Sequence, residues 1–283
     1  MKKEESQDVK KLRLEMEYRN YSSNSVKTYC ELMRFLELSL SKKLHEITID
    51  DLKGFLHIAL VKYQRSTSYI NQMISAYKIF VQDVLKNEWE GIVVKRPRRE
   101  KKLPVVLSIN EVERMISSTR NLKHRAMIML MYSAGLRRTE LLQMKPSAID
   151  SSRMLIHISQ GKGKKDRYSI LSQKTLEILR QHYSLERPKQ YLFEPNGNPG
   201  QRLSDKTIDN IIRKSAARAG ITKTVSCHTL RHSFATHLLE TGVNIKIIQQ
   251  FLGHTSLKTT SIYLHLTNIN IGSVKSPLED MNI

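Results

Sequence analysis

A basic segment that contains proline divides this 283-residue chain into two parts. Six of the eight residues from 95 to 102 are lysine or arginine, and Pro97 disfavours a helix there. On both sides of the segment, apolar residues recur at the period of amphipathic helices. We therefore expect two mainly helical units, over residues 1–90 and 107–266, joined by a basic linker over residues 91–106.

The first unit is expected to be a small all-α domain of four helices. Apolar residues at the helical period indicate helices over residues 25–40 and 66–85, and an earlier helix is expected over residues 4–18. Thr48 is a typical N-cap for a helix over residues 49–63, because its hydroxyl can accept a hydrogen bond from the first turn.

The second unit is expected to be mostly helical, with a small antiparallel β-sheet. Ser108 and Glu111 form a capping box at the start of its first helix. Two strands are expected over residues 154–159 and 167–171, joined by a glycine-rich turn. Further helices are expected over residues 121–133, 138–145, 172–183, 204–219, 228–240, 244–252 and 259–264.

A net charge of +20 favours a polyanionic partner, because lysine and arginine release condensed counterions when they bind phosphates. The alternatives are a basic protein without such a partner and a protein that binds an anionic membrane. A membrane surface is disfavoured because the sequence shows neither a basic amphipathic helix nor a lipidation motif. A membrane span is not expected either, because the longest strongly apolar run, residues 126–132, is far shorter than the roughly 20 residues that span a bilayer. With only Cys30 and Cys227, no disulfide framework or zinc knuckle is expected, and the default location is the reducing cytoplasm.

Several short motifs of the second unit contain residues suited to phosphate chemistry. His228 and Arg231 are spaced i, i+3 and share one helix face, where a guanidinium can bind two phosphate oxygens and an imidazole can exchange a proton. Arg137 opens a helix just after a glycine, and Lys162 lies between two glycines at the tip of the predicted hairpin. Tyr263 follows the sequence Leu-Gly-His by nine residues.

Each motif is ordinary by itself. An arginine at a helix start is common on surfaces, a lysine in a turn is usually solvated, and a tyrosine among isoleucine and leucine is usually part of a core. His228 and His232, at i, i+4, could also hold zinc, but no glutamate lies between them and no cysteine pair accompanies them. The individual motifs therefore do not identify a function.

In order along the chain, the motifs resemble the active-site series of the tyrosine recombinase (phage integrase) family. Residues 230–239 and 22–29 are similar to that family as well, so the resemblance covers nearly the whole chain. It implies an N-terminal core-binding domain with a SAM-like fold, and the simple two-domain Xer-like or transposon integrase subgroup. The series is Gly135-Leu136-Arg137-x-x-Glu140, Gly161-Lys162-Gly163, His228-x-x-Arg231-His232, Leu252-Gly253-His254 and Tyr263.

The resemblance implies that the protein cuts a DNA phosphodiester without a metal, another cofactor or ATP. Tyr263 would be the nucleophile and would form a 3′-phosphotyrosyl link. A free tyrosine has a pKa of about 10, so a base must accept its proton, and His228 is the implied acceptor. Lys162 would protonate the leaving 5′-oxygen. Rejoining to a partner duplex would proceed through a Holliday junction.

The phosphate itself would be held by positive charge and hydrogen bonds. The resemblance implies that Arg137 and Arg231 bind the non-bridging oxygens and that His254 donates a hydrogen bond to them. Glu140 would orient the arginine and His228 without touching the phosphate. These roles complete the set that a metal-free phosphoryl transfer needs.

The implied partner is double-stranded DNA with a specific core site. The DNA would be bound by a homotetramer, and the free protein would be a monomer or weak dimer. The protein would be located in the cytoplasm, associated with the nucleoid. Residues 267–283 would form a tail that exchanges between subunits, and the helix over residues 204–219 would contribute to base readout. The linker would follow the DNA backbone through six basic residues, Lys95, Arg96, Arg98, Arg99, Lys101 and Lys102.

Two other functions fit parts of the pattern. A type IB topoisomerase or a telomere-resolving enzyme would use the same chemistry, but the short two-domain layout disfavours both. A DNA-binding protein with an inactive site is disfavoured by the complete set of residues. Within the family, Xer-type resolution and the integration or excision of a mobile element both stay open.

Overall fold

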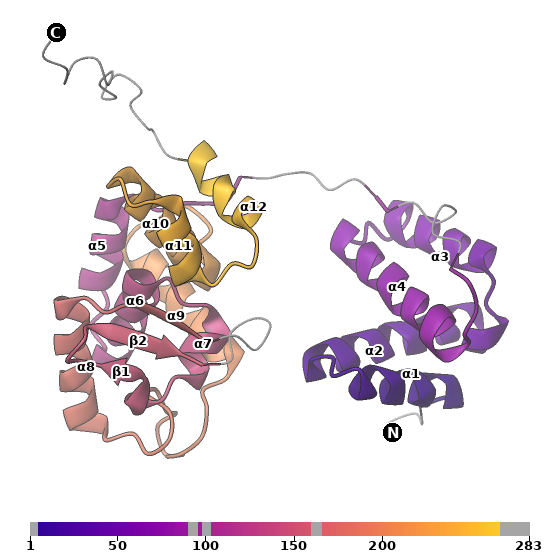
Figure 1. The fold of residues 1–283 in the computed structure, drawn as a ribbon, viewed down its shortest axis with the longest axis horizontal. Helices are drawn as coiled ribbons and strands as arrows, with labels where there is room; N and C mark the ends of the chain where they lie inside the picture. The colour runs from indigo at the N-terminus through magenta and orange to yellow at the C-terminus, as the bar shows by residue number, and fades with distance from the viewer. Residues whose placement is uncertain (1–4, 90–95, 98–102, 160–165, 267–283) are drawn as a thin grey trace, which may run out of the picture. The chain divides into compact units, whose positions relative to one another are not determined.

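The computed structural model describes residues 5–89, 96–97, 103–159 and 166–266. The chain divides into two compact units, residues 1–101 and 102–283 (Figure 1). Both are mainly helical, and the second contains a small antiparallel sheet, so the fold class expected from the sequence is confirmed. In the part of the chain that the structure describes, no helix is both long and apolar enough to cross a membrane.

The described residues of the first unit form four α-helices, as expected. The helix predicted from residue 4 begins at Gln7, because Ser6 caps it by accepting a hydrogen bond from the Val9 N–H. The helix predicted to end at residue 85 continues past residue 79 as a π-helical turn. The elements are α1 (Gln7–Tyr18), α2 (Ser23–Leu40), the 3-10 helix η1 (Leu44–Glu46), α3 (Ile49–Val61), α4 (Thr67–Ile79) and the π-helix η2 (Phe80–Val84).

The core of the first unit is almost entirely apolar. Leu12 of α1, Met33 of α2 and Phe80 of η2 are each fully buried in it. Burial of one such side chain stabilises the fold by about 1.5–3 kcal/mol. Tyr77 of α4 donates a hydrogen bond from its hydroxyl to the carbonyl of Ile47, which fixes the chain just before α3, and burial raises the pKa of this tyrosine to about 12.

The second unit follows the predicted order of helices and strands. The predicted last helix, residues 259–264, is a short α-helix followed by a 3-10 turn. The elements are α5 (Ile109–Ser117), α6 (Leu122–Ala134), α7 (Arg138–Gln143), η3 (Pro146–Ala148), β1 (Ile149–Asp150), β2 (Leu155–Ile158), β3 (Arg167–Ile170), α8 (Gln173–Glu186), α9 (Asp205–Arg218), α10 (Cys227–Glu240), α11 (Ile245–Leu252), α12 (Leu257–Thr260) and η4 (Ser261–His265).

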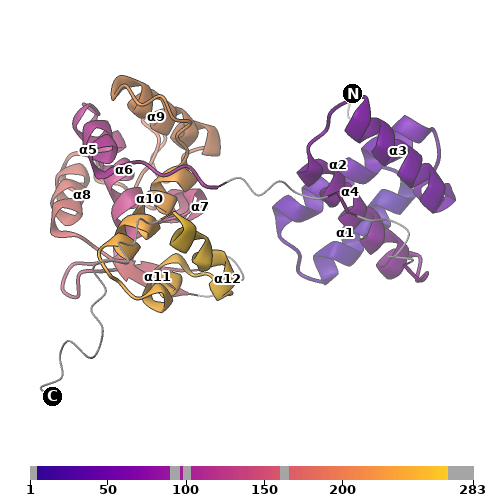
Figure 2. The same ribbon diagram turned by 90° about the horizontal axis from the view of Figure 1, so that it is seen from above.

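The sheet has the order β1-β2-β3, and both pairings are antiparallel. Strand β1 was not expected, because two residues are too few to show an alternating pattern. The side chains of Ile156 and Ile158 face the core, and Ser169 of β3 donates a hydrogen bond to the carbonyl of Ala134 at 2.8 Å. This bond joins the sheet to the end of α6, the central helix that packs against both α8 and α10 (Figures 1 and 2).

Candidate active site

The end of α6 and the start of α7 bring the first arginine to the centre of the second unit. Gly135 ends α6 with a left-handed backbone conformation, φ 60°, which glycine adopts at little cost. A side chain there would also collide with α10, because a Cβ atom would lie 2.4 Å from Cδ1 of Phe234. Arg137 then takes the N-cap position of α7, as predicted.

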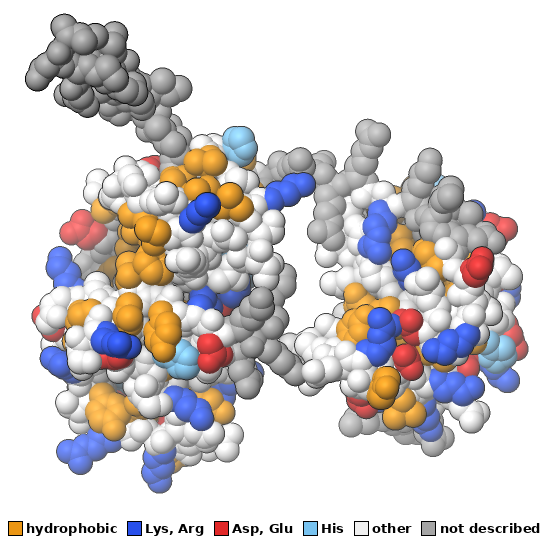
Figure 3. Space-filling model, in the orientation of Figure 1, with side chains coloured by type: hydrophobic (Ala, Val, Ile, Leu, Met, Phe, Trp, Pro, Cys, Tyr) orange, Lys and Arg blue, Asp and Glu red, His pale blue; other side chains and the backbone are white. Residues whose placement is uncertain are grey.

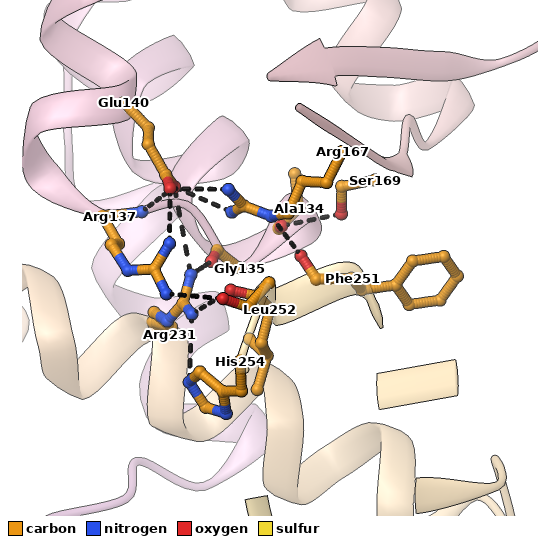
Figure 4. Close-up of polar contacts among 11 residues, drawn as sticks. Ala134, Gly135, Arg137, Glu140, Arg167, Ser169, Arg231, Phe251, Leu252 and His254 are labelled. Carbon is orange, nitrogen blue, oxygen red and sulfur yellow. Dashed lines mark hydrogen bonds and ion pairs between the residues drawn. The ribbon is translucent and has the colours of Figure 1, made fainter. Parts of the chain in front are cut away.

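Glu140, one turn into α7, lies among three arginine side chains (Figure 4). It accepts hydrogen bonds from Arg137 Nη1 at 2.7 Å and from Arg167 at 2.6 and 2.8 Å, and its Oε2 lies 3.9 Å from Arg231 Nη1. It also accepts from the backbone N–H of Arg137 at 2.7 Å. These four residues are called the arginine cluster below.

The arginine cluster carries three positive charges and one negative charge. Burial opposes the ionisation of Glu140, but the hydrogen bonds and charge of Arg167, together with Arg137, outweigh it and lower the pKa of this carboxyl to about 2. Burial and the charge of Arg137 lower the pKa of Arg231 to about 9, so this guanidinium is still protonated at neutral pH. The cluster is therefore net positive, as a phosphate-binding site requires.

Arg231 of α10 is 3 % exposed, and backbone carbonyls fix its direction. It donates to the carbonyl of Gly135 at 2.6 Å and to the carbonyl of Leu252. The last residue of α11 thus contacts the same guanidinium as the C-cap residue of α6. The sequence-predicted pair Arg137 and Arg231 is brought together in this way.

His254 follows α11 and lies beside Arg231. Its Nε2 accepts a hydrogen bond from Arg231 Nη2 at 3.2 Å, and its Nδ1 lies 3.0 Å from Oγ1 of Thr260. Burial and the charges of Arg231 and then Arg137 lower the pKa of His254 to about 4, so the ring is neutral at pH 7. Because an arginine can only donate, a neutral ring carries its proton on Nδ1 in this state.

Tyr263 lies in η4, in a separate apolar pocket that α10 and α11 enclose. It is 1 % exposed and packs with Phe234, Ile248 and Leu252. Its hydroxyl forms a hydrogen bond of 3.0 Å with Nδ1 of His232. These five residues are called the tyrosine pocket below. Burial raises the pKa of Tyr263, although the charges of Arg231 and Arg137 act in the opposite direction.

The histidine that contacts the tyrosine hydroxyl is therefore His232. The resemblance in sequence implies His228 as the proton acceptor. His228 lies one turn earlier on α10, with its ring centroid 6.3 Å from that of His232. It lines a cleft of about 500 Å³ together with Arg137 and Arg138. Burial, and then the charges of Arg231, Arg138 and Arg137, lower the pKa of His228.

A second cleft, of about 620 Å³, borders the arginine cluster at Arg167. Its lining includes Arg167, Tyr168, Gly253 and His254. The described residues contain no group of three or more His, Cys, Asp or Glu side chains arranged to hold a metal ion. The arginine cluster, His254 and the tyrosine pocket together contain two predicted phosphate-binding arginines, the neutral side chains of His232 and His254, and a tyrosine. These groups suit attack on a phosphodiester by an oxygen nucleophile.

Comparison with protein families gives two matches that together span most of the chain. Residues 106–269 match the phage integrase family, and residues 9–91 match the N-terminal SAM-like domain of phage integrases. The chain belongs to the phage integrase family. Its members are tyrosine recombinases, and its relatives indicate a site-specific DNA recombinase.

Named relatives of this recombinase match over most of their length. A putative integrase/recombinase, y4qK, from Sinorhizobium fredii is 35% identical and covers 94% of this chain and 86% of its own. Tyrosine recombinase XerA from Pyrococcus horikoshii is 36% identical over 89% of this chain and 86% of its own. The structure of XerH recombinase bound to its difH substrate shares the fold, with a TM-score of 0.69, 24% identity and coverage of 92% and 82% of the two chains.

Some predicted site residues of the recombinase lie outside the described residues. They are Lys162, Lys95, Arg98, Arg99, Lys101 and Lys102, and the predicted tail over residues 267–283 lies outside as well. Arg96 is described, and it donates to the carbonyl of Asn71 at 3.1 Å and to Oγ of Ser75 at 3.0 Å. This linker arginine therefore contacts α4 of the first unit.

Sequence reasoning missed two residues of the site, Arg167 and His232. Arg167 begins a strand, where an arginine ordinarily points to solvent, and only the fold shows that its side chain is 8% exposed. His232 was part of the recognised second-arginine motif, but no role was assigned to it. A sequence feature related to Arg167 is Gly253, whose missing side chain leaves room for the side chain of Arg167.

Proposed function

We propose that this recombinase cuts and rejoins DNA through a 3′-phosphotyrosyl intermediate formed by Tyr263, without a metal or ATP. The observation that carries the proposal is the convergence of Arg137, Arg231 and His254 on one charged site directly beside the buried Tyr263. These residues come from separate segments of the chain, and in our proposal they supply the phosphate-binding groups and the nucleophile of one reaction.

In the proposed cleavage step, the Tyr263 oxygen forms a bond to phosphorus and the bond from phosphorus to the 5′-oxygen breaks. The tyrosine proton goes to His228, and Lys162 gives a proton to the departing 5′-hydroxyl. Arg137 and Arg231 balance the charge that builds on the non-bridging oxygens. The reverse attack, by a 5′-hydroxyl of a partner duplex, releases Tyr263 and joins the strands through a Holliday junction.

The described conformation constrains this step in two ways. The hydroxyl of Tyr263 is buried against His232, so it must leave that contact to reach a phosphate bound by the arginine cluster. Nε2 of His254 accepts from Arg231, so it can donate to a phosphate only after that bond breaks and the ring takes a proton on Nε2. We propose that both changes accompany the binding of DNA.

The test is covalent capture on nicked DNA. The substrate is a pool of duplexes with randomised arms and a nick beside the central phosphate. When the enzyme cuts there, the short strand with the 5′-hydroxyl diffuses away, so the strands cannot be rejoined and the phosphotyrosyl adduct is trapped. We expect an adduct that survives denaturing electrophoresis with the wild-type protein and none with Tyr263→Phe. Tyr183→Phe, at an exposed tyrosine of the same unit, is the matched control and should form the adduct normally.

Capture also identifies the DNA site after repeated rounds of enrichment. The proposal is wrong if the wild-type chain yields no adduct, or if Tyr263→Phe still yields one. A topoisomerase would instead relax supercoiled plasmids that lack any enriched sequence. The position of the enriched site then separates the two roles that we propose. A single chromosomal locus supports Xer-type resolution, and paired ends of a mobile element support integration or excision.

We propose duplex DNA with a specific core site as the partner, bound through both units. The net charge of +20 and the lysine and arginine side chains on the visible face of each unit support it (Figure 3). Binding should weaken steeply as salt rises, because each phosphate contact releases a counterion. The proposed assembly is a homotetramer. Mass measurement of the complex with a Holliday junction of the captured site tests it, because four copies of the chain should be bound.

A further inference from the structure

We propose that Arg167 is a positioning residue of this reaction, which orients Arg137 and Arg231 by binding both Glu140 and the C-terminal end of α11, just before His254. The inference rests on the proposed function and adds a residue to it. Arg167 stands at the start of β3, where its backbone pairs with Ile158 of β2. The base of its side chain is therefore fixed by the sheet.

The first contact of Arg167 is with the carboxylate of Glu140. Its two terminal nitrogens bind the two carboxylate oxygens at 2.6 and 2.8 Å, and the two side chains are 8% and 5% exposed. Such a two-point contact fixes the plane of the carboxylate. The same oxygens accept from the side chain and the backbone N–H of Arg137, so their direction sets the direction of Arg137.

The second contact of Arg167 is with the C-terminal end of α11. Its Nε donates to the carbonyl of Phe251 at 2.8 Å, and its chain crosses Gly253 so closely that a Cβ atom there would lie 2.6 Å from its Cδ. The next two carbonyls along the chain bind Arg231 and Arg137, which are called the arginine clamp below. The carbonyl of Leu252 accepts from Arg231, and that of Gly253 accepts from Arg137 at 3.2 Å. Arg167 thus holds an acceptor for each phosphate-binding arginine.

Only arginine can make this set of contacts. The guanidinium presents five N–H donors in one plane, and here Nε serves the carbonyl while both terminal nitrogens serve the carboxylate. A lysine at position 167 keeps the charge but can reach only one of the two sites at a time. Because these bonds point into the protein and the side chain is 8% exposed, Arg167 acts through its neighbours.

The test compares cleavage of two substrates by Arg167→Gln and the wild type. Both carry the captured nicked site, one with the natural phosphate and one with a neutral methylphosphonate at the scissile position. The methylphosphonate lacks an anionic oxygen, so its cleavage depends less on the arginine clamp. In single-turnover experiments at saturating enzyme, we expect Arg167→Gln to cleave the phosphate roughly 100-fold more slowly, as misplacement of about 1 Å can cost.

On the methylphosphonate, the loss relative to the wild type should shrink to roughly a tenth of that on the phosphate, because the misdirected clamp matters less there. DNA affinity should change by less than about threefold, since most of it comes from other phosphate contacts. Arg167→Lys should fall between Arg167→Gln and the wild type. Arg180→Gln, which removes an exposed arginine of α8, controls for the lost charge and should behave as the wild type.

A purely structural role predicts a different result. If Arg167→Gln only reduces the folded fraction, both substrates lose the same factor, and the proposal is overturned. It is also overturned if the variant cleaves the phosphate within about threefold of the wild type. Should Arg167→Gln fail to fold, Arg167→Lys decides between the same outcomes. A wild-type chain that forms no adduct on phosphate refutes the proposed function itself, and this inference with it.

Discussion

The arginine cluster and the tyrosine pocket lie side by side, but they hold their polar groups in opposite ways. In the cluster, three guanidiniums share one carboxylate, and every group keeps its charge. In the pocket, the Tyr263 hydroxyl and His232 are neutral partners among apolar side chains, and burial opposes a charge on either. The half that we propose to bind the phosphate is thus charged in advance, and the half that holds the proposed nucleophile is uncharged.

This difference shows where the reaction has to change the protein. A preorganised charged site needs little rearrangement when a phosphate arrives, which is how electrostatic catalysis gains its effect. The proposed nucleophile, by contrast, has to leave an apolar pocket and lose a proton that burial makes harder to remove. Proton transfer from Tyr263 is therefore the step for which the two halves must cooperate.

The largest expected effect follows from removing the base. His228→Phe should slow single-turnover cleavage on the order of 10²–10⁴-fold, the range for loss of a general base. His232→Phe is its matched partner one turn away, and it should slow cleavage no more than about 10-fold while destabilising the fold by about 1–3 kcal/mol. The destabilisation arises because the buried Tyr263 hydroxyl loses its hydrogen-bond partner.

The two histidine variants also decide the assignment. The structure puts His232 on the tyrosine hydroxyl, whereas His228 is assigned from the sequence. Single-turnover rates on nicked DNA and urea denaturation are measured for both. A larger loss of rate in His232→Phe would make His232 the proton acceptor and reverse the proposed roles.

The next effect tests the charged half. Glu140→Ala leaves three buried or half-buried guanidiniums without their shared carboxylate, and such a loss costs about 3–5 kcal/mol of unfolding free energy. Glu140→Gln keeps the shape and one acceptor oxygen, so it should cost less. Urea denaturation followed by circular dichroism measures both. Equal and small losses would mean that the cluster does not depend on this carboxylate.

A smaller effect is expected at Gly135, where the two halves touch. Gly135→Ala places a Cβ atom 2.4 Å from the Phe234 ring of the tyrosine pocket and keeps a positive φ, so it should cost about 2 kcal/mol or more. Gly220→Ala is the control, because Gly220 also has a positive φ, of 65°, but nothing lies within 4 Å of the added atom. Thermal unfolding of the two variants isolates the packing contribution, and identical shifts would show that there is none.

Much of this fold could be predicted from the sequence because its helices carry local signals. Ser108, Asn121 and Ser172 each cap the helix that follows, and Gly135 ends α6 as expected. The errors occur where no local signal exists. Strand β1 has two residues, and the breaks after residues 79 and 260 depend on how the chain packs rather than on composition.

The site was harder to predict because its pairings are long-range. The sequence placed Arg137, Arg231 and His254 in motifs, but it could not show that Arg167 spans Glu140 and Phe251. A buried arginine has no periodic signature, and its partners lie 27 and 84 residues away. The contact between Tyr263 and His232 is likewise set by how η4 packs on α10, which no motif encodes.

The two halves should also respond to acid in different pH ranges. Burial and neighbouring positive charge lower the pKa of His232 and His254 to about 4, from the roughly 6.5 of an unfolded chain. The unfolded state therefore binds these protons first. Their contribution to stability is fully present above about pH 6.5 and is lost as the pH falls from there toward 4. Four other histidines shift in the same direction, namely His124, His182, His228 and His237.

Glu140 responds at a lower pH than the histidines, because its pKa falls from 4.5 to about 2 on folding. Its contribution is present above about pH 4.5 and is lost only below it. The urea midpoint should therefore decline between pH 6.5 and 5.5 chiefly through the histidines, and the lowered carboxyl pKa values add to the decline below that. His232→Phe should lower the slope of stability against pH by up to one proton taken up on unfolding, whereas Glu140→Gln should leave the slope in this range unchanged. A slope that follows Glu140 instead would mean that the charged half, and not the neutral one, is the acid-sensitive part of the site.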